Sequence, residues 1–214
     1  MVRVGDKYAP KEFRRSEDEL SYALPSGFEH RYDVDSSIIL YSLIRHFKPR
    51  YCLEIGSWKG GTTCVTMDAL IKNNLPFQFV VSELVKDLQI ETVKNCLEQC
   101  GMAPAMVGDI TKCSLIALPP KFDLLVIDID HDQPTSEWII KNIFPLLRTG
   151  ALVAIHDWAV KDIDGQWIEK DDAWPETKYL IDLRRKGKLP LEKLYWNYTG
   201  QGSLESSFWV YKSL

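Results

Sequence analysis

The chain has 214 residues, of which 45% are hydrophobic, and a formal net charge of -4. This length suits one α/β domain with a full core, and the slightly acidic balance gives no support for a nucleic-acid partner. No apolar run approaches the roughly 18 residues of a membrane helix, and the first residues lack the apolar segment of a signal peptide. We therefore expect a cytoplasmic protein that binds neither nucleic acid nor membrane.

The five cysteines do not show the spacing of a metal site. Cys96 and Cys100 lie four residues apart on a predicted helix, which differs from a metal knuckle. An odd number of cysteines also argues against a complete set of internal disulfides. The sequence therefore predicts buried thiols in a reducing compartment.

Residues 1–33 mix charged and aromatic residues without a period. They are predicted to form an N-terminal arm, which is either a solvated extension or a cover over a ligand site. The main domain is expected to span residues 34–214. Within it, residues 158–190 are polar and tryptophan-rich, which predicts an insertion or lid.

Hydrophobic periodicity predicts helices alternating with short apolar strands along most of the main domain. The first helix should follow an N-cap at Asp35, and the fourth should start at Pro134 and close with a basic last turn at Arg148 and a glycine at Gly150. Alternation with short loops favours a doubly wound parallel sheet. The expected strands are 51–55, 77–82, 103–107, 122–128, 151–155, 194–198 and 207–211, and the expected helices are 35–47, 62–72, 87–99, 134–150 and 176–186.

A glycine-rich turn follows the first expected strand. Gly56 and Gly60 allow positive φ and a close approach of a ligand to the backbone. The helix that opens near Thr62 would direct its N-terminal N–H groups toward the turn, where they can hold a carboxylate. Glu54, near the strand end, would repel a diphosphate but would suit a ligand with an ammonium group or hydroxyls.

Acidic residues stand at the carboxyl end of each of five expected strands. These ends meet at one edge of a parallel sheet, where ligands bind, so a shared site is expected there. After the second strand, the two oxygens of Glu83 would suit the vicinal diol of a ribose. Asp109 is either a ligand contact or the cap of the following turn. The five residues are Glu54, Glu83, Asp109, Asp128 and Asp157.

The run from Glu54 to Thr62, Glu-Ile-Gly-Ser-Trp-Lys-Gly-Gly-Thr, resembles the first motif of class I S-adenosylmethionine-dependent methyltransferases. The dinucleotide fingerprint G-x-G-x-x-G does not fit it. Two later segments, 122–131 and 146–157, are similar to small-molecule and sugar O-methyltransferases, with D-x-D-H after the fourth strand and H-D after the fifth. The resemblance covers roughly residues 35–158. It implies a mostly parallel, seven-stranded Rossmann-like sheet with helices on both faces and an antiparallel last strand.

The same resemblance implies roles for single residues. Asp128 and His131 would be catalytic, His131 as the general base. A divalent cation such as Mg²⁺ would bind Asp128, His156 and Asp157; relatives often carry another ligand at the second position, so His156 is alternatively an orienting histidine. The cofactor would contact Glu54, Gly56, Ser57, Trp58, Gly60, Thr62, Glu83, Asp109 and Asp128, with Asp109 near the adenine.

The expected function is methyl transfer from S-adenosylmethionine to a hydroxyl of a small molecule or sugar. One alternative, a nicotinamide-dependent oxidoreductase, is disfavoured because the dinucleotide fingerprint is missing. Another, a non-catalytic cofactor-binding module, would not need Asp128, His131 and Asp157.

The basic run 184–188 either contacts an anionic acceptor or is the basic end of a helix, and Trp158, Trp167 and Trp174 form either a platform for the acceptor or a local core. The acceptor is not identified, because its contacts are expected in the arm and in residues 158–190, where the resemblance fades. Self-association into a homo-oligomer is left open.

Overall fold

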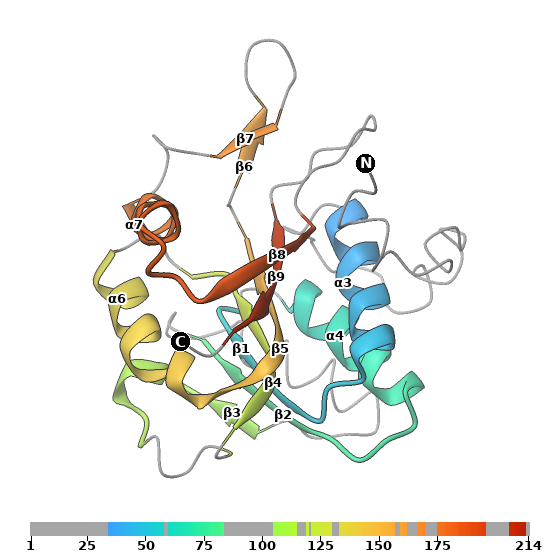
Figure 1. Cartoon of the computed structure of the whole chain (residues 1–214). Helices are drawn as coiled ribbons and strands as arrows, with labels where there is room; N and C mark the ends of the chain where they lie inside the picture. The colour runs from blue at the N-terminus through green and yellow to red at the C-terminus, as the bar shows by residue number, and fades with distance from the viewer. Residues whose placement is uncertain are drawn as a thin grey trace.

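The computed structural model in Figure 1 contains one large sheet with helices on either side and a separate two-stranded ribbon. It describes residues 34–57, 60–83, 105–114, 119, 121–129, 133–156, 159–161, 167–169, 175–195 and 206–212. The predicted arm 1–33 and the predicted helix 87–99 lie outside these ranges.

The order of elements follows the predicted alternation of strands and helices. The first part contains α3 (Val34–Phe47), β1 (Tyr51–Ile55), α4 (Gly61–Lys72), β2 (Gln78–Ser82), β3 (Ala105–Val107), the 3₁₀ turn η2 (Ile110–Lys112) and β4 (Phe122–Ile127). The second part contains α6 (Gln133–Asn142), the 3₁₀ turn η4 (Phe144–Leu146), β5 (Leu147–Ile155), β6 (Ala159–Lys161), β7 (Trp167–Glu169), α7 (Pro175–Arg185), β8 (Leu191–Tyr195) and β9 (Ser207–Tyr211).

The seven strands of the large sheet are ordered β3-β2-β1-β4-β5-β9-β8. Strands β1 to β5 pair in parallel, whereas β9 runs antiparallel to both of its neighbours. The predicted fold class is therefore confirmed, including the antiparallel last strand. The chain moves outward from β1 to β3 and then returns to β4 beside β1, so the switch point of the sheet lies between β1 and β4.

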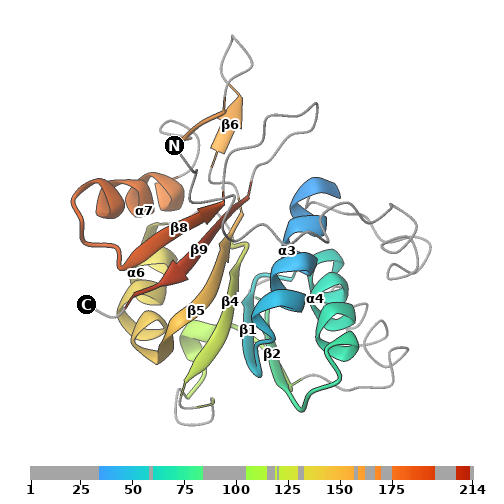
Figure 2. The same cartoon turned by 45° about the vertical axis from the view of Figure 1, so that its right-hand side comes forward.

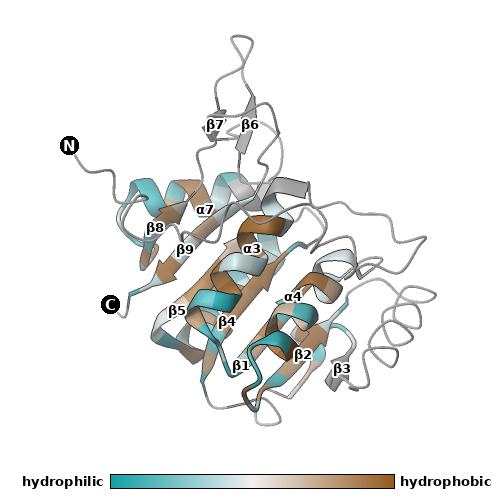
Figure 3. Ribbon diagram, turned by 90° about the vertical axis from the view of Figure 1, so that its right-hand side faces the viewer, coloured by the Kyte–Doolittle hydropathy of each residue, from teal (hydrophilic) through white to brown (hydrophobic). Residues whose placement is uncertain are grey.

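Helices α3 and α4 cover one face of the sheet, and α6 and α7 cover the other (Figure 2). Side chains alternate between these layers along each strand. In β1, Cys52 packs in the cluster under α3 and α4, whereas Leu53 and Ile55 pack in the cluster under α6 and α7. Because both faces are covered, the central strands are apolar over most of their length, and Figure 3 shows β4 and β5 mostly brown behind α3.

The segment between α6 and β5 differs from its prediction. Helix α6 ends at Asn142 and strand β5 already begins at Leu147, so the predicted helical turn around Arg148 is wrong. Pro145 lacks the N–H that a continuing helix needs. The Arg148 guanidinium instead pairs with Asp123 at 3.0 Å, and Gly150, with φ of +88°, lies where the β4–β5 register shifts.

Three further bounds differ. Helix α3 begins at Val34, so Asp35 belongs to its first turn and is not its N-cap. Strand β8 spans Leu191–Tyr195, three residues earlier than expected, because it pairs with β9 directly after Pro190, whose carbonyl accepts from the Lys212 N–H. The β6–β7 ribbon arises from residues for which no strand was predicted.

The cysteine prediction is partly wrong, because Cys64 is disulfide-bonded. Cys52 and Cys113 are free thiols. Burial raises the pKa of the Cys52 thiol well above its usual value, and the charge of Asp123 adds to the rise, so this thiol stays protonated. Within the described part of the chain, no helix combines the length and apolar character that a membrane span requires.

Candidate cofactor and active site

Four predicted site residues follow directly after neighbouring strands, and the N–H groups of three of them continue the hydrogen-bond ladder. The Gly56 N–H donates to the Ser82 carbonyl at 2.8 Å, and the Asp128 N–H donates to the Ile55 carbonyl at 2.9 Å. The His156 N–H donates to the Ile127 carbonyl at 2.9 Å. Continued by one residue, the strand registers place these positions in one row across the carboxyl edge of the sheet: Glu83, Gly56, Asp128 and His156.

The side chains of this row share one face of the sheet. Val81, Val126 and Ala154 pack in the cluster under α3 and α4. Because strand side chains alternate, the positions two residues later in each strand lie on the same side, where the helices α3 and α4 begin. By the same alternation Glu54 lies on this face, one pleat below Gly56. The structure therefore brings Glu54, Glu83, Asp128 and His156 together at the switch point.

Gly56 occupies a position that admits only glycine. Its φ is +86°, and a Cβ built there would lie 1.6 Å from the Asp128 carbonyl oxygen. At this positive φ, a residue with a β-carbon would also be strained. This glycine therefore lets the ends of β1 and β4 approach each other at the switch point.

The rest of the glycine turn connects β1 to α4. Gly60 is the N-cap of α4 in a left-handed conformation with φ of 84°. Its N–H donates to the Ser57 carbonyl at 2.7 Å, which closes the turn. Thr62 is buried in the first turn of α4, where helix N–H groups can receive a carboxylate. Trp58 lies outside the described residues.

Ser57 connects the glycine turn to Glu83. Its backbone N–H donates to Glu83 Oε2 at 2.8 Å, and its Oγ donates to the same oxygen at 3.1 Å. Both residues are buried, so these charge-assisted bonds are well shielded from water. The sequence predicted both residues as cofactor contacts but did not predict that they bind each other.

Glu54 is fully buried, with an exposed fraction of 0%. Burial raises the pKa of its carboxyl well above the usual value. The Thr63 hydroxyl opposes the rise, and the charges of Asp128 and Glu83 add to it. In the described structure, neither carboxylate oxygen of Glu54 has a hydrogen-bonding partner, so the Thr63 hydroxyl is not bonded to it. Burial therefore dominates the shift of the Glu54 pKa.

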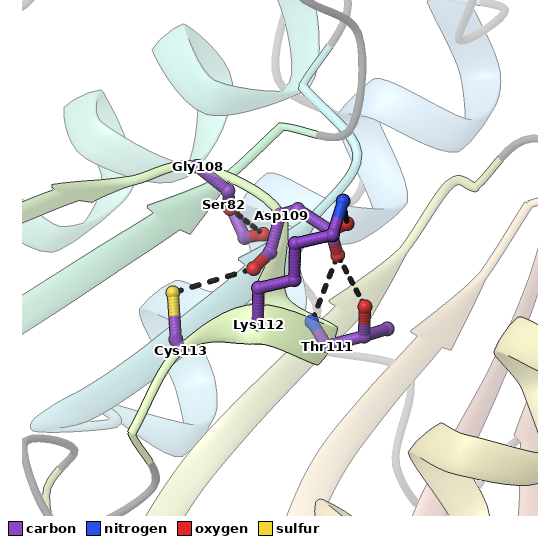
Figure 4. A network of polar contacts seen from close by, with 6 residues as sticks. All are labelled: Ser82, Gly108, Asp109, Thr111, Lys112 and Cys113. Carbon is purple, nitrogen blue, oxygen red and sulfur yellow. Dashed lines mark hydrogen bonds and ion pairs between the residues drawn. The ribbon is translucent and has the colours of Figure 1, made fainter.

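Asp109 caps the turn η2, as one of its two interpretations predicted (Figure 4). Its Oδ1 accepts from the backbone N–H of Thr111 at 2.9 Å and from the Thr111 hydroxyl at 2.6 Å, while Lys112 Nζ lies 2.6 Å from Oδ2. The bond from Lys112 and those from Thr111 hold the pKa of Asp109 below its usual value. Beside it, the Ser82 hydroxyl donates to the Gly108 carbonyl at 2.8 Å. The adenine contact stays a prediction.

Asp128 and His156 form a pair across the ends of β4 and β5. His156 Nδ1 lies 3.3 Å from Asp128 Oδ1, and the imidazole is buried. This geometry fits the interpretation of His156 as an oriented histidine. The predicted base His131 and the predicted metal ligand Asp157 lie outside the described residues. Among the residues that are described, no three His, Cys, Asp or Glu side chains lie in a position to hold one metal ion.

Sequence reasoning missed one polar position at this edge. Ser206, directly before β9, is fully buried, and its Oγ has no hydrogen-bonding partner among the described residues. Since Ile155 pairs with Ser207, Ser206 stands opposite His156. No local signal distinguishes this serine, because its place depends on the antiparallel pairing of β9 with β5.

Comparison with known proteins agrees with this architecture. Residues 53–158, about half of the chain, match the family model of a methyltransferase domain. None of the curated proteins matches the chain. The matched residues run from β1 to just beyond β5 and include the whole row at the carboxyl edge of the sheet.

Solved structures show the same fold at low sequence identity. An O-methyltransferase from Bacillus cereus in complex with SAH is 17% identical, with a TM-score of 0.65 over 98% of this chain and 95% of that one. The O-methyltransferase TomG from Streptomyces achromogenes, in complex with SAM, is 16% identical, with a TM-score of 0.61 over 100% and 91%. The SAH-bound methyltransferase PaMTH1 from Podospora anserina is 13% identical, with a TM-score of 0.61 over 95% and 89%.

These findings agree with the motifs at the end of β1 and with the sheet order. The nicotinamide alternative loses its support, since the matched family is a methyltransferase domain and the turn after β1 lacks the dinucleotide fingerprint. The chain is a class I S-adenosylmethionine-dependent methyltransferase.

Proposed function

We propose that the protein transfers the methyl group of S-adenosylmethionine to a hydroxyl of a small molecule or sugar. The observation that carries this proposal is the row of Glu83, Gly56, Asp128 and His156 at the switch point, with Glu54 beneath it. The structural neighbours described as O-methyltransferases support oxygen as the accepting atom.

The glycine turn would receive the methionine end of the cofactor. N–H groups at the start of α4 suit its carboxylate, and Glu54 suits its ammonium. Glu83, held by Ser57, would bind the ribose hydroxyls with a preset carboxylate. Asp109 would stand near the adenine. We also propose Trp58 as a cofactor contact, because it lies within the motif that follows β1.

In the reaction, the acceptor oxygen attacks the methyl carbon, a C–O bond forms and the C–S bond breaks. The electron pair of that bond stays on sulfur, which becomes a neutral thioether. The acceptor must lose its proton, and we assign this to His131, with the Asp128–His156 pair as a second candidate. Holding the two reactants in line supplies the remaining rate acceleration.

A divalent cation remains part of the proposal, on Asp128, His156 and Asp157. The described residues bring only the first two of these together, which does not make a complete ligand set, and no step is derived through a metal. Activity measured in excess chelator, with Mg²⁺ or Mn²⁺ added back, decides this point. Full activity in chelator would remove the metal and leave the histidines as proton acceptors.

The cofactor assignment is tested by calorimetric titration with S-adenosylhomocysteine, with NAD as the control ligand. Glu83→Gln should weaken S-adenosylhomocysteine binding by about 1.5–3 kcal/mol, the scale of hydrogen bonds to a charged group. Glutamine still offers an oxygen to Ser57, whereas alanine would also leave the Ser57 N–H without its acceptor. Unchanged affinity with a lowered melting temperature would assign Glu83 a purely structural role.

The acceptor is tested by incubating the protein with methyl-labelled S-adenosylmethionine and a panel of phenols, sugars and amines. Label transferred to oxygen only would support the proposal. His131→Ala should then lose roughly 10²–10⁴-fold in rate while cofactor binding persists. Transfer to nitrogen alone would contradict the hydroxyl acceptor.

A further inference from the structure

Glu54 has no role in the folded structure that explains its burial. Its side chain is fully buried next to the apolar residues of β1, and neither carboxylate oxygen has a hydrogen-bonding partner in the described structure. An ionised carboxylate in such a place costs several kcal/mol, so the group either neutralises or needs a cation beside it. The described fold supplies no such cation, so it must come from a ligand that binds in the site.

The charged groups that face Glu54 are carboxylates. Glu83 at the end of β2 and Asp128 at the end of β4 both disfavour a further negative charge, and burial has a still larger effect in the same direction. On β5, His156 pairs with Asp128. Helix α4 offers the Thr63 hydroxyl, and no described lysine or arginine acts on Glu54.

Among the described side chains in the first turns of helix α3, the buried polar ones are two serines, Ser36 and Ser37. Among the described residues, the groups around Glu54 are therefore neutral hydroxyls and carboxylates, apart from the histidine that already faces Asp128. In the empty site, the neutral acid is the form of Glu54 that these surroundings favour.

We propose that Glu54 holds a proton while the cofactor site is empty and releases it when a ligand with an ammonium group binds beside it. The inference rests on the proposed function, because the methionine end of the cofactor supplies the ammonium. The proton leaves the Glu54 carboxyl for solvent, and the ammonium keeps its own protons. One positive charge enters with the ligand and one negative charge appears on the protein.

This exchange makes Glu54 a specificity-determining residue. A ligand that brings an ammonium stabilises the carboxylate, whereas a nucleoside without the amino-acid end meets a neutral acid and gains nothing from it. Cofactor affinity should therefore rise with pH until Glu54 ionises without help. For one released proton the limit is about tenfold in Kd per pH unit.

The test is calorimetry of the full chain with S-adenosylhomocysteine in two buffers that differ in ionisation enthalpy. A pH of about 6–6.5 keeps the ligand's α-amino group fully charged. The difference in observed heat gives the number of protons released, which should be clearly above zero. The comparison ligand is 5′-methylthioadenosine, which has the nucleoside and the thioether but no ammonium, and it should release none.

Glu54→Gln should bind S-adenosylhomocysteine more weakly, without proton release. Glu192→Gln, which changes a half-exposed carboxylate on β8, is the matched control and should behave as the wild type does. Equal proton release with both ligands, or none with either, would overturn the inference and leave the cofactor site standing. Absence of any S-adenosylhomocysteine binding would overturn the proposed function as well. If the glutamine variant does not fold, the two ligands on the wild type decide alone.

Discussion

Asp123 at the amino edge of the sheet and Glu54 at the carboxyl edge differ in how their carboxylate oxygens are hydrogen-bonded. At the amino edge, Asp123 Oδ2 accepts from the N–H groups of Arg50 and Tyr51 at 3.0 Å each, and its Oδ1 accepts from Arg148 at 3.0 Å. At the carboxyl edge, Glu54 is fully buried, and neither of its oxygens has a hydrogen-bonding partner among the described residues. The carboxylate of Asp123 is hydrogen-bonded within the fold, whereas we propose that the carboxylate of Glu54 meets a ligand.

The difference follows from chain topology. At the amino edge, side chains and strand N–H groups meet within the fold, and the Arg148 guanidinium also lies 5.1 Å from the centre of the Tyr51 ring. At the carboxyl edge, the connections that follow β1 and β4 lead to helices on opposite faces of the sheet, an arrangement in which α/β sheets commonly bind ligands. A buried polar group without a partner therefore indicates function more clearly than a charged residue in a network.

The largest effect that we expect from a single change at the carboxyl edge is that of Gly56→Ala. The new Cβ would meet the Asp128 carbonyl at 1.6 Å, so β1 and β4 must separate. We expect a loss of about 4 kcal/mol or more in the free energy of unfolding, together with loss of cofactor binding. Urea unfolding and calorimetry measure the two effects.

Gly150→Ala is the control for this change. Gly150 has nearly the same φ, +88°, but open space around its position, so only the backbone strain of about 1–2 kcal/mol should remain. If the two variants lost equal stability, the close approach of β1 and β4 would not be what requires glycine at position 56.

At the amino edge, Asp123→Ala should cost about 1–3 kcal/mol of unfolding free energy, because the N–H groups of Arg50 and Tyr51 lose their acceptor. Cofactor affinity should not change, since the site lies at the opposite edge. Thermal melts and titration with S-adenosylhomocysteine measure both quantities. If the folded variant bound S-adenosylhomocysteine more weakly, the amino edge would also affect cofactor binding, and a purely structural role of this edge would be contradicted.

Asp109→Ala separates two roles at one residue. Loss of the η2 cap should cost about 0.5–2 kcal/mol of stability. If Asp109 also contacts the adenine, affinity for S-adenosylhomocysteine should fall, whereas a pure cap would leave the affinity of the folded protein unchanged. Thr111→Val is the control, because it removes one bond to the Asp109 carboxylate but keeps the carboxylate itself.

The smallest effect concerns the ligand-free stability of Glu54→Gln. Burial raises the folded pKa of Glu54 above its usual value of 4.5, so the folded protein holds a proton that the unfolded chain has lost. Stability is then fully present below about 4.5 and declines as pH rises toward the folded pKa. Glutamine avoids this decline, so the melting temperature of the variant should exceed that of the wild type by a margin that grows with pH. Parallel curves of melting temperature against pH would contradict a neutral Glu54 in the empty protein.

Local patterns in the sequence already indicated the main features of this protein. Hydrophobic periodicity predicted the alternation of strands and helices, because burial on both faces requires apolar runs at those places. The glycine turn and the acidic strand ends predicted a cofactor site at one edge of the sheet, since parallel strands bring their carboxyl ends together there. The bounds of β5 and β8 escaped prediction, because they depend on pairing with strands far away in the sequence.

Only the tertiary structure determined which hydrogen bonds and ion pairs the site residues form. It made Asp109 a cap, gave the Glu83 carboxylate to Ser57 and paired His156 with Asp128. It also left Glu54 buried without a partner. Each of these outcomes depends on which atoms from distant segments come within hydrogen-bonding distance, and residue types along a chain do not determine that distance.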